Sequence, residues 1–75
     1  MALSDKIKAL LTLKGKKTQD LAEHFQVTVQ SMRNKMCRDT YTAAELIEIV
    51  EFAGARLIIE DNDGLRIVIS KSDIS

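Results

Sequence analysis

The sequence predicts a mostly α-helical fold, with four helices followed by a C-terminal β-hairpin. Residues 5–53 carry apolar side chains at spacings of three and four, which is typical of helices. Two apolar runs then flank the turn sequence Asn62-Asp63-Gly64, which is typical of a hairpin. The 75 residues suffice for one small domain. The lone Cys37 excludes an internal disulfide, and the apolar runs are too short to span a membrane.

The first two helices are predicted over residues 5–14 and 18–25. Ser4 is the expected N-cap of the first helix, and Gly15 is its expected stop. In the second helix three residues form an apolar stripe: Leu21, Ala22 and Phe25. A short basic turn joins the two helices.

The stretch TVQSMRNKM begins with the alternation of a strand, but a third helix over residues 29–37 explains it better. Thr28 can act as an N-cap by accepting a hydrogen bond from the amide of Gln30 or Ser31. Three apolar residues recur at helical spacing on one side: Val29, Met32 and Met36.

A fourth helix is predicted over residues 43–53. Thr42 and Glu45 have the spacing of a capping box, and Tyr41 and Leu46 have that of a hydrophobic staple. The expected buried stripe consists of Leu46, Ile49, Val50 and Ala53. Ile47 and Phe52 lie off this stripe, and we expect them to meet the C-terminal segment or a partner.

The hairpin is predicted with strands over residues 56–61 and 65–70, and with Gly64 in the left-handed region of the turn. This register pairs Glu60 with Arg66, Ile59 with Ile67, and Leu57 with Ile69. One face (Leu57, Ile59, Ile67 and Ile69) is expected to turn toward the helices, while Ile58 and Val68 occupy the other. Because a lone ribbon with two apolar faces is unstable, Phe52 covers it in part or a second copy pairs with it. The candidate dimer-interface residues are Phe52, Ile58 and Val68.

Charge is balanced overall but unevenly distributed along the chain. Residues 14–38 carry six basic and two acidic residues, whereas residues 39–75 carry three basic and eight acidic ones. If the basic residues share one surface, they favour a nucleic-acid partner; otherwise they form an ordinary solvated face.

The second and third helices have the arrangement of a helix-turn-helix. The outer face of the third helix holds side chains that can read DNA bases: Gln30, Ser31, Asn34 and Arg38. Arg33 and Lys35 lie on its two flanks, where contacts to phosphate are expected.

The stretches TQDLAEHFQVTVQSMRNKM and YTAAELIEIVEFAGA resemble the phage repressor/Cro-type (Xre-like) helix-turn-helix family, over about residues 5–54. The resemblance implies a lambda-repressor-like domain in a DNA-binding transcription regulator of phage or mobile-element type. Such a protein binds double-stranded DNA as a homodimer on a pseudo-palindrome, and some members dimerise through C-terminal strands. It also implies that Thr28 approaches the DNA, and that Thr18 or Gln19 contacts phosphate. The single Cys and the lack of a signal-peptide apolar region favour a cytoplasmic location.

The sequence departs from this family at Gln26, where Gly is usual, and in the Met32/Met36 spacing. The full set of phosphate candidates is Thr18, Gln19, Thr28, Arg33, Lys35, Lys16 and Lys17. No enzyme, metal site, cofactor or small-molecule ligand is predicted, because no nucleophile–base pair, ligand set or phosphate loop is evident. The alternative function is a protein-interaction module of helix-turn-helix shape, either antitoxin-like or an assembly subunit.

Overall fold

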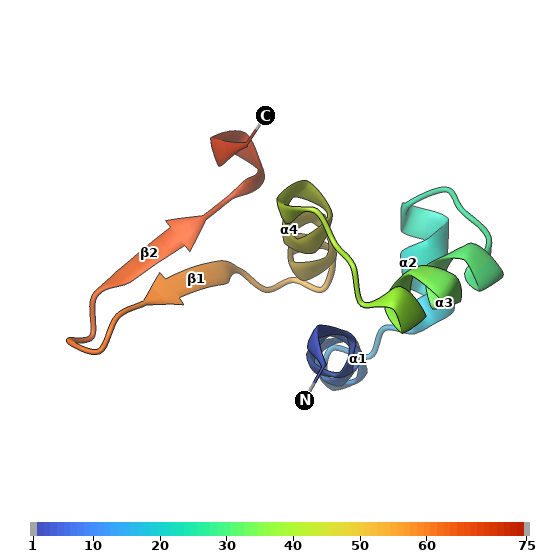
Figure 1. Cartoon of the computed structure of the whole chain (residues 1–75), viewed down its shortest axis with the longest axis horizontal. Helices are drawn as coiled ribbons and strands as arrows, with labels where there is room; N and C mark the ends of the chain where they lie inside the picture. The colour runs from blue at the N-terminus through green and yellow to red at the C-terminus, as the bar shows by residue number, and fades with distance from the viewer. Residues whose placement is uncertain (1, 75) are drawn as a thin grey trace.

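The computed structural model describes residues 2–74, which form four α-helices, a two-stranded antiparallel sheet and a short 3-10 helix (Figure 1). The elements are α1 (Leu3–Leu13), α2 (Thr18–His24), α3 (Val29–Arg38), α4 (Ala43–Phe52), β1 (Leu57–Glu60), β2 (Arg66–Ile69) and η1 (Lys71–Asp73). The molecule measures 41 × 28 × 23 Å. Within residues 2–74, no helix has the length and apolar character needed to cross a membrane.

The four helices meet in one apolar core. Its buried residues are Ile7 and Leu11 of α1, Leu21 and Ala22 of α2, Met32 and Met36 of α3, Ile49 of α4, and Ala53 directly after α4. The prediction that Met32 and Met36 form the inner face of the third helix is therefore confirmed. Their flexible side chains fill the space between α3 and the rest of the core. This packing fixes which side of α3 remains exposed.

The prediction that Ser4 caps the first helix is wrong. α1 begins two residues earlier than expected, Ala2 is its N-cap residue, and Ser4 lies within the helix with only 5% of its surface exposed. The Asp39 carboxylate accepts hydrogen bonds from the amides of Leu3 and Ser4 at 3.3 and 2.6 Å. Asp39 thereby satisfies backbone amides at the start of α1 that would otherwise need a nearby capping side chain.

α3 is a helix, as predicted, and the alternative of an edge strand is excluded. The Ser31 amide donates to the Thr28 hydroxyl oxygen at 3.0 Å, which confirms Thr28 as the N-cap. The helix ends one residue later than predicted, at Arg38, because Asp39 adopts a left-handed φ of 56°. Gln26, in the turn before α3, has a φ of 59°, a conformation for which Gly is better suited.

α4 confirms the predicted capping box and buries apolar residues on two sides. The Thr42 amide donates to Glu45 at 2.8 Å, and the Glu45 amide donates to the Thr42 hydroxyl at 3.1 Å. Ile47 is only 1% exposed but does not belong to the core shared by the four helices, so it lies off the predicted stripe, as expected. α4 lies between the helices and the C-terminal segment, where it contacts β1 and η1 (Figure 1). A second apolar face, which includes Ile47, is therefore covered.

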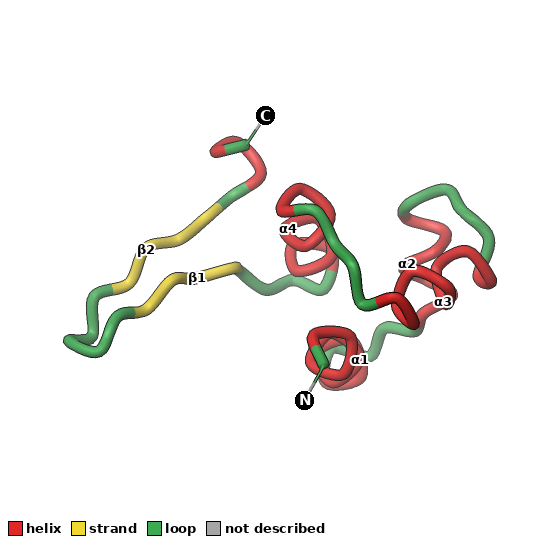
Figure 2. The backbone as a smooth tube through the Cα atoms, in the orientation of Figure 1, coloured by secondary structure: helices red, strands yellow, loops and turns green. Residues whose placement is uncertain are grey.

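The hairpin has the predicted register, but it points away from the helices. Its pairs are Leu57 with Ile69, Ile58 with Val68, Ile59 with Ile67, and Glu60 with Arg66. The expectation that one whole face turns toward the helices is wrong, since Ile59 and Ile67 are 53% and 62% exposed. Only the base of the ribbon lies near α4, and its tip projects from the body of the molecule (Figure 2).

Candidate nucleic-acid interface

The outer face of α3 is polar and exposed, as the helical periodicity predicts. All four predicted base-reading residues are exposed on it: Gln30, Ser31, Asn34 and Arg38. The Gln30 amide donates to the Asn34 carbonyl oxygen at 3.0 Å, which links successive turns of the helix. That oxygen has a second lone pair, and the Asn34 amide nitrogen keeps both protons available. The exposed face is thus partly ordered but retains free donors and acceptors.

The N-terminal end of this face carries two hydroxyls. The Thr28 hydroxyl lies 2.9 Å from that of Ser31 and also accepts from the Ser31 amide. Both side chains are exposed. Thr28 therefore holds the first turn of α3 in place at the end of the helix that is expected to approach DNA.

Two adjacent shallow grooves lie along the side of the molecule where α3 faces α1. One, of about 270 Å³, is lined by Lys8, Thr18, Arg33, Met36 and Cys37. The next, of about 300 Å³, is lined by Lys8, Leu11, Thr12, Lys16, Lys17 and Thr18. Because Lys8 and Thr18 line both, cations from α1, the following turn and α3 come together on one continuous surface. We call this surface the basic groove.

Lys8 was missed by the reasoning from sequence. It lies on α1, outside the basic run of residues 14–38, and only the packing of α1 beside α2 and α3 brings it to Arg33. Of the two alternatives at the start of α2, Thr18 lines the basic groove, whereas Gln19 is exposed and lines neither part of it.

Lys16 is less available than its sequence position suggests. Its ammonium nitrogen lies 5.3 Å from the centroid of the Phe52 ring, within range of a cation–π contact. The same ring packs against His24, with centroids 4.7 Å apart. Phe52 is half-buried by these contacts within its own chain, unlike Ile58 and Val68, which are 38% and 46% exposed.

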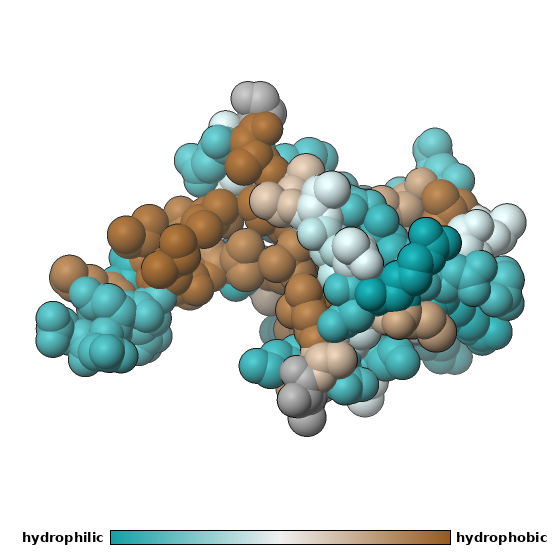
Figure 3. All heavy atoms as spheres, viewed as in Figure 1, coloured by the Kyte–Doolittle hydropathy of each residue, from teal (hydrophilic) through white to brown (hydrophobic). Residues whose placement is uncertain are grey.

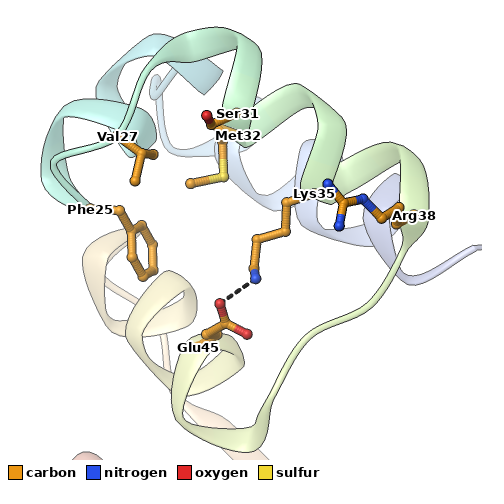
Figure 4. Close-up of a pocket in the computed structure, with 7 residues that line it drawn as sticks. All are labelled: Phe25, Val27, Ser31, Met32, Lys35, Arg38 and Glu45. Atoms are coloured by element: carbon orange, nitrogen blue, oxygen red, sulfur yellow. Dashed lines mark ion pairs between the residues drawn. The ribbon is translucent and has the colours of Figure 1, made fainter.

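The edge of α3 that faces α4 carries a different groove, of about 260 Å³ (Figure 4). Its lining residues are Phe25, Val27, Ser31, Met32, Lys35, Arg38 and Glu45. Lys35 reaches from α3 to form an ion pair with Glu45 of α4 (Figure 4). The hydrogen bond from Lys35 holds the pKa of Glu45 below its usual value. This cation is therefore already neutralised, whereas Arg38 forms no ion pair among residues 2–74.

Further acidic residues of α4 are also engaged with basic partners. Glu48 accepts from His24 at 2.7 Å and from the Lys71 ammonium at 3.0 Å. The bond from Lys71 makes the largest contribution to lowering the pKa of Glu48, and the bond from His24 lowers it further. Glu48 in turn raises the pKa of Lys71. Glu51 accepts from the Lys71 amide at 3.1 Å. This cluster ties η1 and α2 to α4, on elements other than α3.

Within residues 2–74, no group of three or more His, Cys, Asp or Glu side chains is placed to hold a metal ion. Cys37 is an exposed free thiol at the rim of the basic groove. No protein-family model matches the chain, and no curated protein or solved structure matches it either. Function is therefore inferred from the residues of this surface.

Proposed function

We propose that the protein is a small sequence-specific DNA-binding transcription regulator, in which α2, the following turn and α3 form a helix-turn-helix. One observation carries the proposal. The polar outer face of α3, which includes Arg38, lies beside the basic groove along one edge. A helix that carries base-reading side chains beside phosphate-binding cations has the chemistry required for the major groove.

The base-reading roles follow from side-chain chemistry. Asn34 and Gln30 can each form two hydrogen bonds with adenine, and Arg38 can form two with guanine. The bond between Gln30 and Asn34 restrains both amides before DNA is bound. Since the N-terminal part of a recognition helix lies nearest the bases, Gln30 and Asn34 are favoured over Arg38 for direct reading.

The phosphate-binding roles fall to the basic groove. Lys8, Lys17 and Arg33 supply the positive charge, and the Thr18 hydroxyl can donate a hydrogen bond to a phosphate oxygen. With about three to five phosphates neutralised by each protomer, log affinity falls with log salt with a slope of about −3 to −5 per protomer.

The regulator acts as a homodimer on a pseudo-palindrome in this proposal. Two recognition helices related by a two-fold axis read half-sites about 34 Å apart, which is one turn of DNA. The exposed apolar hairpin is the element that would join the protomers.

Two lysines of α1 offer a matched test of the proposal. Lys8 lines the basic groove, whereas Lys6, two residues earlier, is exposed and does not. In fluorescence titrations of a DNA duplex, Lys8→Ala is expected to weaken binding and to reduce the salt slope by about 1. Lys6→Ala should leave both quantities close to wild type. Equal effects of the two variants, or no binding by the wild type at low salt, would contradict the proposal.

A second candidate function is a protein-interaction module of the same shape, antitoxin-like or part of an assembly. The observation that favours it is the hairpin, whose apolar side chains are exposed on both faces. The two candidates separate in the same titration. A module of this second kind binds no duplex at low salt and is insensitive to Lys8→Ala.

A further inference from the structure

Strand β1 has a sequence that can pair with itself. Around Ile58 the order is Arg56-Leu57-Ile58-Ile59-Glu60, with opposite charges at the two ends and apolar residues between them. We propose that β1 pairs antiparallel with β1 of a second copy, across a two-fold axis at Ile58, to give a four-stranded sheet. This inference rests on the homodimer of the proposed function and specifies the edge, the register and the charge pair that form it.

The backbone of β1 has the right groups at its free edge. The Asp61 amide donates to the Leu65 carbonyl at 3.0 Å, in the same register as the rest of the hairpin. Because hydrogen-bonded and non-hydrogen-bonded pairs alternate in an antiparallel ladder, Leu57 and Ile59 also direct their amides toward β2. Arg56, Ile58 and Glu60 therefore direct theirs outward. A two-fold axis at Ile58 places these three residues in hydrogen-bonded pairs with the second copy.

The side chains match in the same register. Arg56 lies opposite Glu60 of the second copy, and Glu60 lies opposite its Arg56, so each dimer contains two favourable charge pairs. Leu57 lies opposite Ile59 of the second copy in a non-hydrogen-bonded pair, where side chains approach most closely. Ile59, which is 53% exposed, thereby gains an apolar neighbour on its unpaired side.

The outer edge of β2 is less suited to the same contact. The Ser70 amide already donates to the Asp73 carboxylate at 2.7 Å, and the following amide, of Lys71, donates to Glu51. A two-fold axis at Val68 would place Arg66 opposite Ser70 and would create no opposite charge pair. The free backbone groups and the complementary charges thus both lie on β1.

The hairpin also has a physical reason to find such a partner. It is the whole sheet within residues 2–74, and a two-stranded ribbon is marginal on its own. Figure 3 shows apolar side chains spread along this ribbon, with polar ones gathered at its tip. An exposed apolar edge is a template for pairing with another chain, and two-fold pairing of β1 uses that edge in a closed assembly.

Charge reversal tests the register directly. Arg56→Glu and Glu60→Arg each place like charges opposite one another in a homodimer, and each should weaken dimerisation by about tenfold or more in sedimentation equilibrium. An equimolar mixture of the two variants should restore a dimer that contains one copy of each. Arg66→Ala removes the partner of Glu60 within the hairpin, 3.2 Å away, and should leave the dimer intact.

A pair of proline variants keeps the test decisive if a charge reversal unfolds the hairpin. Ile58 and Val68 face each other across the ribbon, and both direct their amides outward. Proline is tolerated at such edge positions, so both variants should remain folded by circular dichroism. Ile58→Pro should abolish the dimer, and Val68→Pro should retain it.

Three outcomes would overturn the inference: a monomeric wild type at micromolar concentration, a dimer that both charge reversals leave unchanged, or equal effects of the two prolines. The last two would assign the contact to the faces of the hairpin or to another surface. Sedimentation involves no DNA, so a failure here is distinguishable from a failure of DNA binding.

Discussion

Asp39 joins the end of α3 to the start of α1 through Ser4. Its Oδ1 atom accepts a hydrogen bond from the Ser4 amide at 2.6 Å and lies 2.7 Å from the Ser4 hydroxyl. That hydroxyl also lies 2.7 Å from the Met36 carbonyl oxygen and 2.6 Å from the Tyr41 hydroxyl. The bonds from Ser4 lower the pKa of Asp39. One buried serine therefore fixes the C-terminal end of α3, whose outer face is proposed to meet DNA.

Ser4→Ala should destabilise the fold. The change removes the hydroxyl that the Met36 carbonyl, the Asp39 carboxylate and the Tyr41 hydroxyl share, although the Met36 carbonyl keeps the Asp39 amide as a donor. The loss should cost about 1–3 kcal/mol, while the helix propensity of Ala returns about 0.5 kcal/mol. Urea denaturation should show a lower midpoint with an unchanged slope. Tyr41→Phe, which removes only one of these bonds, should have the smaller effect. An unchanged midpoint for Ser4→Ala would show that this cluster does not stabilise the fold.

Two residues in the left-handed region should respond in opposite ways to Gly. Gln26 has a φ of 59°, and its side chain makes no hydrogen bond within residues 2–74, so Gln26→Gly should raise the free energy of unfolding by up to about 1 kcal/mol. Asp39 has a φ of 56°, but its carboxylate caps α1, so Asp39→Gly should lower stability. Thermal unfolding of both variants measures the contrast. If both variants changed the free energy of unfolding in the same direction, the proposed strain at Gln26 or the proposed capping by Asp39 would be contradicted.

Acid should weaken the link between α3 and α4. The folded pKa of Glu45 lies below its ordinary value of 4.5, because Lys35 bonds to the ionised form. A lowered folded pKa stabilises the fold above the ordinary value, and this contribution is lost as pH falls through the folded pKa. The melting temperature should therefore fall below about pH 4.5, and Lys35→Met should flatten this part of the profile. Lys6→Met, which removes an exposed lysine of α1, should leave the profile unchanged.

Arg33 and Lys35 should contribute unequally to DNA binding, although they are two residues apart on α3. Arg33 lines the basic groove and has no ion-pair partner within residues 2–74, whereas Lys35 is paired with Glu45. Arg33→Ala should reduce the salt slope by about 1, and Lys35→Ala should reduce it by less. Glu45→Gln frees Lys35 and should strengthen binding. A larger loss from Lys35→Ala than from Arg33→Ala would contradict this division.

The features that were predicted correctly depend on residues close together in sequence. The Thr42–Glu45 capping box and the Thr28 cap each span three residues. The hairpin register follows from a short turn that ends in Gly64, which has a φ of 87°. Local hydrogen bonds and the backbone freedom of glycine determine these features, so the sequence alone suffices.

The errors arose where distant segments meet. The prediction of a Ser4 cap fails because the group that serves the start of α1 is Asp39, 35 residues later in the chain, which no local sequence pattern indicates. Helix packing places Lys8 in the basic groove, and it also brings Glu45 close enough to form an ion pair with Lys35. Charge and periodicity in the sequence indicate that α3 has a polar, basic surface, but tertiary contacts determine which residues belong to it.

Selection of bound duplexes from a random DNA library tests the central claim most directly, namely that the outer face of α3 reads DNA. The wild type should enrich a pseudo-palindromic motif with half-sites one helical turn apart. Asn34→Ala, changed at an exposed position, should lose preference at one base pair in each half-site and keep the spacing. Recovery of the same motif by Asn34→Ala would contradict the role of Asn34, and enrichment of no motif by the wild type would contradict the claim itself.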